Sequence, residues 1–369
     1  MENNKPKIAI IGLKGLPAYG GAARVGENII EQLKDKYDFT VLSVSSHSQK
    51  LDKRINGVNQ IVFNKVGNGG LNTLFYYLKC LFHVLPRKYD LIHLHHAESG
   101  FITPFLRLKY KVVVTFHGIY KNNDPKFSKF LNWFFRYGEK KNVQYANQVV
   151  SVSSPDSEYI EKNYSKQILY IPNGINLKNS IEYRPVIQSQ KKDYIFFAAG
   201  RIYQIKGLHL LLKAVKKINA QIEIKIAGDL NQIPEYRKEI EFLSAELNVS
   251  YEGMIKDKLT LMSMIAAAKF FVFPSLTEAM SMMLLEVVSM KTPVIASNIL
   301  SNRAVFNDDE LLFFKTNEAD DLALKIEFAL NNNDDMSQRA GRAYEKLKNE
   351  YTWKMIAKQY ETIYDNLLK

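Results

Sequence analysis

The amino-acid sequence predicts an α/β protein with two doubly wound parallel sheets. Short apolar runs of strand length alternate with longer amphipathic segments through both halves of the chain, which is the order typical of βα units. Several of these runs end in glycine, as KIAIIG (Lys7 to Gly12) and YIFFAAG (Tyr194 to Gly200) do. The length of 369 residues is too great for one ordinary core and fits two domains of roughly 150 to 200 residues each.

The first strand, Lys7 to Gly12, runs into a glycine-rich turn that contains Gly20 and Gly21, and a helical pattern follows from Ala22 to Leu33. A turn at a helix N-terminus offers unpaired N–H groups that attract phosphate. The glycine spacing is not that of the dinucleotide fingerprint, and no acidic residue follows the second strand, Phe39 to Val44. The pattern favours a loop that contacts phosphate, with a plain flexible loop as the alternative.

Two later runs, Asp90 to His96 and Lys111 to Gly118, each read as a strand that ends in histidine. Ligands of open parallel sheets bind beyond the carboxyl ends of the strands, so this position favours a functional role for His117. The three histidines of the first run are not expected to bind a metal. Strand alternation sends His95 and His96 to opposite faces, and no acidic or Cys partner has suitable spacing.

The stretch from Phe270 to Ile299 predicts a βαβ unit with two parallel strands side by side, separated by a buried helix from Met280 to Met290. Glu278 lies just before this helix and Glu286 lies inside it. A carboxylate in so apolar a segment should be paired or functional, because an unpaired buried charge is costly. The alternative is a helix N-terminal acid together with one buried, hydrogen-bonded Glu.

Arg201 and Lys206 follow the first strand of the second half and precede an amphipathic helix from Leu208 to Ile218. A guanidinium and an ammonium in this position can bind a diphosphate. Two solvated surface charges are the alternative. Their expected place on the same sheet edge as the Glu278 loop favours binding.

The remaining expected elements complete two sets of βα units around a polar linker at 176–192. They are strands at Val149 to Ser154, Ile222 to Gly228, Val249 to Gly253, Phe270 to Phe273 and Val294 to Ala296, a strand end with a turn at Ile171 to Ile175, and helices over 320–350 and from Tyr351 to Leu368.

The single cysteine, Cys80, excludes an intrachain disulfide, and its apolar neighbours favour a buried thiol in a reducing compartment. The chain shows no apolar leader and no run of ~18 apolar residues, so a cytoplasmic protein without a membrane span is expected.

The net charge of +12 is unevenly distributed. Residues 1–180 hold 25 Lys and Arg against 13 Asp and Glu, whereas residues 181–369 hold 25 of each kind. Such asymmetry indicates an anionic partner. Aromatic residues lie among the cations in Leu74 to Lys79 and in Lys126 to Arg136. Such segments can lie in a membrane interface, although aromatic residues that simply face the core are the alternative.

As an ordered set, these residues resemble the family-4 glycosyltransferases of the GT-B fold, and the resemblance covers nearly the whole chain. The motifs that carry it are Gly20-Gly21, Asp90 to His96, Thr115 to Gly118, Pro172-Asn173-Gly174, Gly200-Arg201 with Lys206-Gly207, and Glu278 and Glu286 in E-x7-E spacing followed by Thr292-Pro293-Val294. The resemblance implies two Rossmann-like domains that face a cleft. They are an acceptor domain, 1–180 with a returning helix at 352–369, and a donor domain, 181–351.

The resemblance also implies roles for single residues. Arg201 and Lys206 would hold the donor diphosphate, Glu286 the ribose hydroxyls, and Glu278 would lie beside the transferred sugar. Gly20 and Gly21 would approach the diphosphate from the first domain, His117 would contact the sugar, and the N–H groups of Ser281, Met282 and Met283 would face phosphate or sugar. Methionines replace the small residues usual after the first glutamate, which leaves the sugar undefined.

The implied reaction moves a hexosyl or deoxyhexosyl group from a nucleotide-diphosphate sugar to a hydroxyl of a glycan or lipid-diphosphate-linked acceptor, with retention of configuration. The setting would be surface-polysaccharide synthesis (O-antigen or capsule), with the basic first half on the anionic inner face of the cell membrane. No cofactor, metal or nucleic acid is expected.

Two other functions compete with this one. A glycoside hydrolase needs two carboxylates ~5 to 9.5 Å apart, whereas eight helical residues would separate Glu278 from Glu286 by roughly 12 Å along the axis. A non-catalytic module that binds a nucleotide sugar or a polyanion would leave the Glu286 carboxylate unexplained.

Overall fold

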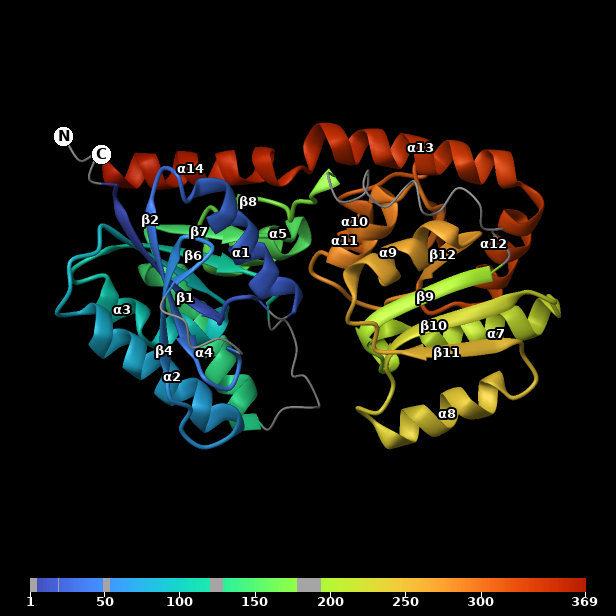
Figure 1. Ribbon diagram of the computed structural model, residues 1–369, viewed down its shortest axis with the longest axis horizontal. Helices are drawn as coiled ribbons and strands as arrows, with labels where there is room; N and C mark the ends of the chain where they lie inside the picture. Colours follow the sequence, from blue (N-terminus) through green and yellow to red (C-terminus); the bar gives the residue numbers. More distant parts are fainter. Residues whose placement is uncertain (1–4, 19, 49–53, 120–128, 178–193) are drawn as a thin grey trace. The chain divides into compact units, whose positions relative to one another are not determined.

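The computed structural model describes residues 5–18, 20–48, 54–119, 129–177 and 194–369. The chain divides into two compact units, Met1–Asn173 with Trp353–Lys369, and Gly174–Thr352. Each unit has its own parallel sheet (Figure 1). Residues 178–192 of the predicted linker lie outside the described residues.

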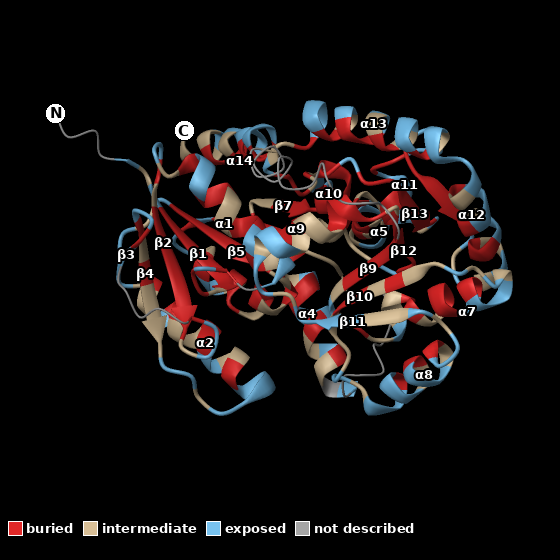
Figure 2. Ribbon diagram, turned by 45° about the vertical axis from the view of Figure 1, so that its right-hand side comes forward, coloured by how far each residue is buried: buried red, intermediate tan, exposed pale blue. Residues whose placement is uncertain are grey.

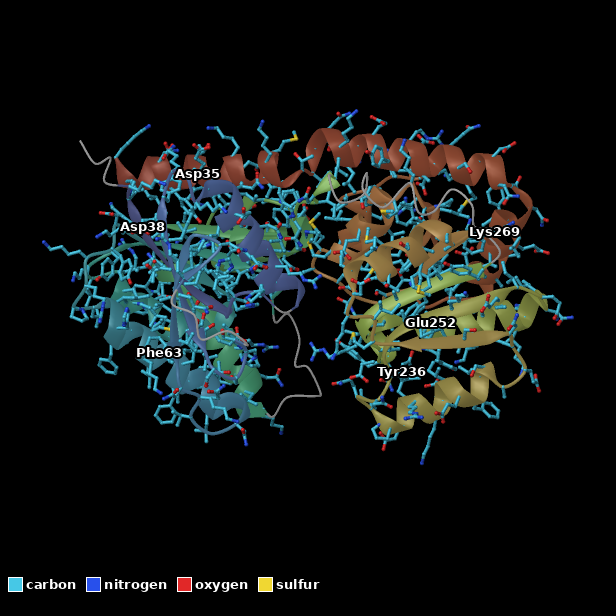
Figure 3. All side chains as sticks on the ribbon, in the orientation of Figure 1. Asp35, Asp38, Phe63, Tyr236, Glu252 and Lys269 are labelled. Carbon is cyan, nitrogen blue, oxygen red and sulfur yellow. The ribbon has the colours of Figure 1, made fainter. Side chains whose placement is uncertain are left out.

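The first unit contains an eight-stranded sheet in the order β3-β4-β2-β1-β5-β6-β7-β8. All neighbours are parallel except β3 and β4. The order reverses between β1 and β5, which is where a doubly wound sheet opens a crevice beyond its strand ends. The strands are β1 (Lys7–Lys14), β2 (Asp38–Val44), β3 (Arg54–Ile55), β4 (Val58–Phe63), β5 (Leu91–His95), β6 (Lys111–Phe116), β7 (Gln148–Ser151) and β8 (Leu169–Tyr170). Figure 3 labels Asp38 at the start of β2.

Helices cover both faces of this sheet. One face packs into a core cluster that includes Cys80, Ile92, Leu94 and Val114, and the buried thiol agrees with the sequence expectation. The helices that contribute to this cluster are α2 (Gly69–Val84), the 3₁₀ helix η1 (Ala97–Phe101), α3 (Thr103–Leu106), α4 (Lys129–Tyr145) and α5 (Ser154–Tyr164). Figure 2 shows the strands β1, β2 and β5 buried along most of their length.

The last helix of the chain, α14 (Trp353–Leu368), belongs to the first unit. It packs against α1 (Gly21–Leu33) and β5. Two of its tyrosines, Tyr360 and Tyr364, are fully buried, and Lys36 of the segment after α1 lies 2.5 Å from Asp365. This confirms the prediction that the final helix returns to the first domain.

The second unit contains a six-stranded, all-parallel sheet in the order β11-β10-β9-β12-β13-β14. Its order reverses between β9 and β12. The predicted βαβ unit is present, because β12 and β13 pair in parallel. The strands are β9 (Tyr194–Arg201), β10 (Glu223–Asp229), β11 (Val249–Gly253), β12 (Phe270–Phe273), β13 (Val294–Ser297) and β14 (Leu312–Phe314).

The helices of the second unit form two layers, each over its own core cluster. One layer contains α9 (Lys258–Ala267), α10 (Met282–Ser289) and α13 (Asn333–Glu350), and the other contains α7 (Leu208–Ile218), α8 (Pro234–Ser244) and α12 (Ala319–Asn331). Tyr236 of α8, labelled in Figure 3, accepts a hydrogen bond from the N–H of His209 in α7 at 3.2 Å. The helical stretch predicted at 320–350 consists of two helices, α12 and α13, which meet at Asn332.

Among the described residues, no helix combines the length and the apolar character needed to span a bilayer.

Two glycines allow η1 to lie directly against α4. A Cβ atom on Gly138 would overlap the carbonyl oxygen of Ala97, and one on Gly100 would overlap the carbonyl of Gly138. Such backbone approach leaves no room for a methyl group. The close contact supports the short segment that follows β5, whose end carries the histidines discussed below.

We therefore expect Gly138→Ala to destabilise the first unit by about 1–3 kcal/mol, because a methyl group inserted into a packed contact forces the two backbones apart. Gly341→Ala is the matched control. It is also a glycine inside a helix, but its added Cβ meets nothing within 4 Å, and alanine favours helix by up to about 1 kcal/mol. Denaturant unfolding followed by circular dichroism measures both. Equal stability of the two variants would contradict the contact.

Candidate active site

Two loops of the second unit meet at the carboxyl ends of β9 and β12, between which the strand order of the sheet reverses. Gly207 ends the loop after β9, with φ at +72°. A side chain there would overlap the carbonyl oxygen of Pro274, at the end of β12. The N–H of Leu276 donates to the carbonyl oxygen of Ile205 at 2.8 Å, which ties the two loops together. Only glycine combines this conformation with this approach.

This contact brings Lys206 to Glu278. Lys206 Nζ lies 2.6 Å from Glu278 Oε1, and the Ser275 hydroxyl donates to the same oxygen at 2.9 Å. The two charged side chains are only 22% and 15% exposed, so solvent screens the pair weakly. Glu278 is therefore a paired carboxylate at the carboxyl ends of two central strands, β9 and β12.

A pocket of about 80 Å³ opens at this pair. Its lining comes from the ends of β9 and β12 and from the start of α10, and consists of Phe197, Ala198, Ala199, Gly200, Lys206, Phe273, Pro274, Ser275, Glu278, Ser281 and Met283. Ser281 is the N-cap of α10, and its hydroxyl accepts from the N–H of Leu284 at 3.4 Å. The N–H groups of Met282 and Met283 precede the first intrahelical bonds, so this helix end attracts an anion.

The position of α10 corrects one sequence argument. The helix begins at Met282, so Glu278 lies in the preceding loop and not eight helical residues from Glu286. The rise per residue of a helix therefore does not measure the separation of the two carboxylates. Their partners distinguish them instead, because Glu278 pairs with Lys206 and the buried Glu286 pairs with Lys258 at 2.5 Å.

The remaining predicted site residues of this unit lie close to the pocket. Arg201 is exposed and follows Gly200, which lines the pocket. Met282 and Met283 are half-buried and pack against the core cluster of α9 and α10. Lys258 was not among the residues predicted for the site. In the sequence, the one feature that could have pointed to Lys258 is its place directly after Asp257. Asp257 accepts from the Thr260 N–H and so caps α9.

In the first unit, histidines gather where β5 and β6 end. His93 Nδ1 lies 2.7 Å from the Tyr364 hydroxyl and Nε2 lies 2.8 Å from the Thr115 hydroxyl. His95 Nδ1 lies 2.9 Å from His117 Nε2, and these two rings stack. The Nδ1 atom of His117 is buried and has no partner among the described residues.

His96 departs from the predicted alternation. It has φ at +70°, outside the β region, so strand alternation does not apply to it. Its ring centroid lies 5.1 Å from that of His117, which His95 also contacts. The expectation that His95 and His96 diverge to opposite faces of a strand is therefore wrong.

These imidazoles are uncharged at neutral pH. Burial, reinforced by His117, lowers the pKa of His93 to about 3. Burial, with Lys14 nearby, lowers the pKa of His96 to about 4. The same desolvation holds the pKa of His95 and of His117 well below the usual value. A neutral imidazole donates from one nitrogen and accepts at the other, so His117 can exchange hydrogen bonds with hydroxyl groups.

The glycine pair of the first unit lies at a helix N-terminus, as predicted. Gly20 is the N-cap of α1, with φ at +94°, and Gly21 is the exposed first residue of the helix. Residues Gly20, Gly21 and His117 belong to the first unit, and all other predicted site residues belong to the second.

Comparison with known proteins identifies the family. A model described as "Glycosyltransferase Family 4" matches residues 19–179, and one described as "Glycosyl transferases group 1" matches residues 179–347. The chain belongs to glycosyltransferase family 4. It is a nucleotide-sugar-dependent enzyme that transfers a sugar with retention of configuration.

Individual relatives agree with this assignment. The chain is 24% identical to an uncharacterised glycosyltransferase of Methanocaldococcus jannaschii, over 95% of this chain and 96% of the relative. It is 24% identical to the UDP-Gal:α-D-GlcNAc-diphosphoundecaprenol α-1,3-galactosyltransferase of Escherichia coli, over 84% of each chain. The structure of sucrose-phosphate synthase from Thermosynechococcus elongatus superposes with a TM-score of 0.81 at 22% identity, over 98% of this chain and 99% of that one. This likeness confirms the GT-B fold.

The neutral histidines make the stability of this glycosyltransferase depend on pH. With a pKa of about 3 in the folded state and about 6.5 when unfolded, His93 binds a proton only in the unfolded chain between these values. Stability is therefore complete above pH 6.5 and falls as the pH drops. His93 alone should cost the first unit about 1.4 kcal/mol between pH 7.5 and 5.5.

Denaturant unfolding at these two pH values measures the loss. His93→Asn should reduce the loss of stability between the two pH values by about 1.4 kcal/mol, whatever its effect on stability at pH 7.5. An unchanged loss would show that His93 is already protonated in the fold or does not titrate in this range.

Proposed function

We propose that the enzyme transfers a hexosyl group from a UDP-linked donor to a hydroxyl of a lipid-diphosphate-linked glycan, in the synthesis of a surface polysaccharide. The main support for a donor site is the Lys206–Glu278 pair, which lies at the pocket where α10 begins. The Escherichia coli relative, by its name, uses UDP-galactose and a diphosphoundecaprenol acceptor.

In this proposal the second unit binds the donor. Arg201, Lys206 and the N–H groups of Ser281, Met282 and Met283 contact the diphosphate, and Glu286 receives the ribose. Negative charge grows on the leaving diphosphate in an oxocarbenium-like transition state, so a fixed cation stabilises the transition state more than the ground state. Lys206 is held in place for this by Glu278, which lies beside the transferred sugar.

The first unit would complete the site with His117 and the glycine pair. A neutral His117 with a free Nδ1 suits a sugar hydroxyl, because it neither repels the oxocarbenium-like ring nor needs to change protonation state. Gly20 and Gly21 offer the N–H groups of a helix start to the diphosphate.

We also propose that the first unit docks on an anionic membrane, where a lipid-linked acceptor resides. The aromatic residues of α2 and α4 are divided between core and surface. Tyr76 and Phe135 are buried, whereas Phe82 and Trp133 are 70% and 58% exposed. Leu108, between α3 and β6, is 86% exposed. Cations accompany this surface, and Lys141 lies over the ring of Tyr137. Apolar anchors among cations suit an anionic interface.

Sugar transfer by variants tests the donor site. The donor nucleotide is first chosen by thermal stabilisation with UDP, GDP, dTDP and ADP, since ligands of the native state raise its apparent stability. Glu278→Gln should then lower kcat on the order of 10²-fold, because it removes the charge that holds Lys206. Arg201→Ala should lower kcat/KM by at least tenfold. Arg237→Ala, at an exposed arginine of α8, is the control. Activity of both site variants within a few-fold of wild type would remove them from the site.

Liposome flotation tests the membrane contact. Wild-type protein should float with vesicles that contain anionic lipid and much less with neutral ones, and added salt should weaken the binding. A Phe82→Ser/Trp133→Ser variant should float several-fold less. Phe242→Ser, at a 77% exposed phenylalanine of the second unit, should behave as wild type. Equal flotation with neutral and anionic vesicles would reject the electrostatic part of the proposal.

A further inference from the structure

A partly buried ion pair joins α9 and α10 close to the pocket, and the side chain of its lysine is 35% exposed. Glu286 lies one turn beyond Met283, which lines the pocket, and its side chain is 9% exposed. Its Oε1 atom lies 2.5 Å from Nζ of Lys258, the first residue of α9. A carboxylate buried to this extent needs such a partner, because an uncompensated charge is strongly disfavoured there.

The fold holds Lys258 in this position. Asp257 accepts from the N–H of Thr260 at 2.8 Å and so defines where α9 begins. Met262 of α9 and Leu284 of α10 are buried in one core cluster. The lysine and the glutamate therefore project from two helices whose spacing is determined by packing, and the pair does not depend on a mobile loop.

Both members of the pair keep unused hydrogen-bonding capacity. The Nζ atom of Lys258 is itself buried, and Glu286 is its sole partner within the described ranges. An ammonium group has three N–H donors, so two of them lack an acceptor. On the other side, Lys258 is the one partner of the Glu286 carboxylate among the described residues, and the Oε2 atom of Glu286 is not fully buried, so a ligand can reach it. A buried ammonium nitrogen is rarely left with unpaired N–H groups, which indicates a ligand that accepts from Lys258 and that can also donate to Glu286.

Adjacent hydroxyl groups of a ribose have this chemistry. One hydroxyl can donate to Oε2 of Glu286, and the oxygen of its neighbour can accept from Nζ of Lys258. We propose that Lys258 is a specificity-determining residue of the donor site, which together with Glu286 reads the vicinal hydroxyls of a ribonucleoside diphosphate and discriminates against 2′-deoxyribose donors. This inference rests on the proposed function, in which Glu286 receives the ribose.

Discrimination follows because a 2′-deoxyribose leaves a polar group of the site without a hydrogen-bond partner. Without the 2′-hydroxyl, the buried Nζ atom of Lys258 loses an acceptor that the described part of the protein does not supply. Sites built to bind a hydroxyl reject the analogue that lacks it far more strongly than apolar pockets reject a changed methylene. Donors linked to dTDP would therefore be poor substrates, whichever sugar they carry.

The experiment compares the affinities of UDP and 2′-deoxy-UDP by isothermal titration calorimetry, with the GDP and ADP pairs measured in the same way. Wild-type protein should bind the ribose form at least tenfold more tightly. In Lys258→Met the ratio should fall several-fold towards one, mainly through weaker binding of the ribose form. Lys256→Met is the matched control, since Lys256 is an exposed lysine of the same segment, and it should keep the wild-type ratio.

A second variant covers the case in which Lys258→Met leaves Glu286 without a counter-charge and fails to fold. Lys258→Met/Glu286→Gln removes both charges at similar volume, and it should bind the ribose and deoxyribose forms within a few-fold of each other. A wild-type ratio near one, or a wild-type ratio retained in both Lys258 variants, would overturn the inference and leave the donor site intact. Failure of the wild-type protein to bind any of the three ribonucleoside diphosphates would overturn the proposed function itself, and the inference with it.

Discussion

The close approach of the loop after β9 to the loop after β12 is the constraint on which the pocket of the second unit depends. Gly207 has a left-handed conformation and lies against the Pro274 carbonyl, where any side chain would collide. The hydrogen bond from the Leu276 N–H to the Ile205 carbonyl oxygen joins the same two loops. Lys206 and Glu278, 72 residues apart in sequence, meet because of this backbone contact. Their pairing is a result of how the two strand ends are joined, and each charge keeps the other in place.

The first unit orders its site by a different means. Its histidines are held by burial and by hydroxyl groups instead of by opposite charges. Tyr364 reaches His93 from the last helix of the chain, and Thr115 reaches it from the neighbouring strand. The imidazoles are uncharged, whereas the second unit has an ion pair at its pocket. The two units thus hold their polar side chains in place by different means.

The fold could be predicted from the sequence to a large extent, because continuous apolar runs identify buried parallel strands. The boundaries expected for 249–253, 270–273 and the helix at 208–218 agree with the structure. The strand β14 was not predicted, although Leu311 to Phe314 is an apolar run as long as the one at 270–273. The helix α2 is hard to recognise because its aromatic residues face both core and solvent, which blurs the 3.6-residue period.

The site could be predicted in part. Glu278, Lys206 and the start of α10 are found from motifs at strand ends, and the structure brings them together at one pocket. His96 could not be placed, because its positive φ breaks an alternation that holds only within a strand. Lys258 could not be found either. Its partner lies 28 residues away on another helix, and no local pattern links two such positions.

The membership of α14 in the first unit has a consequence for biosynthesis. A ribosome makes residues 353–369 after every residue of the second unit. Until then His93 lacks the Tyr364 hydroxyl, and the face of β5 and α1 that α14 covers is open to water. Domains generally fold as units in the order of synthesis. Here the domain that is begun first is completed last, so the growing chain must carry an exposed apolar face through the synthesis of the entire second unit.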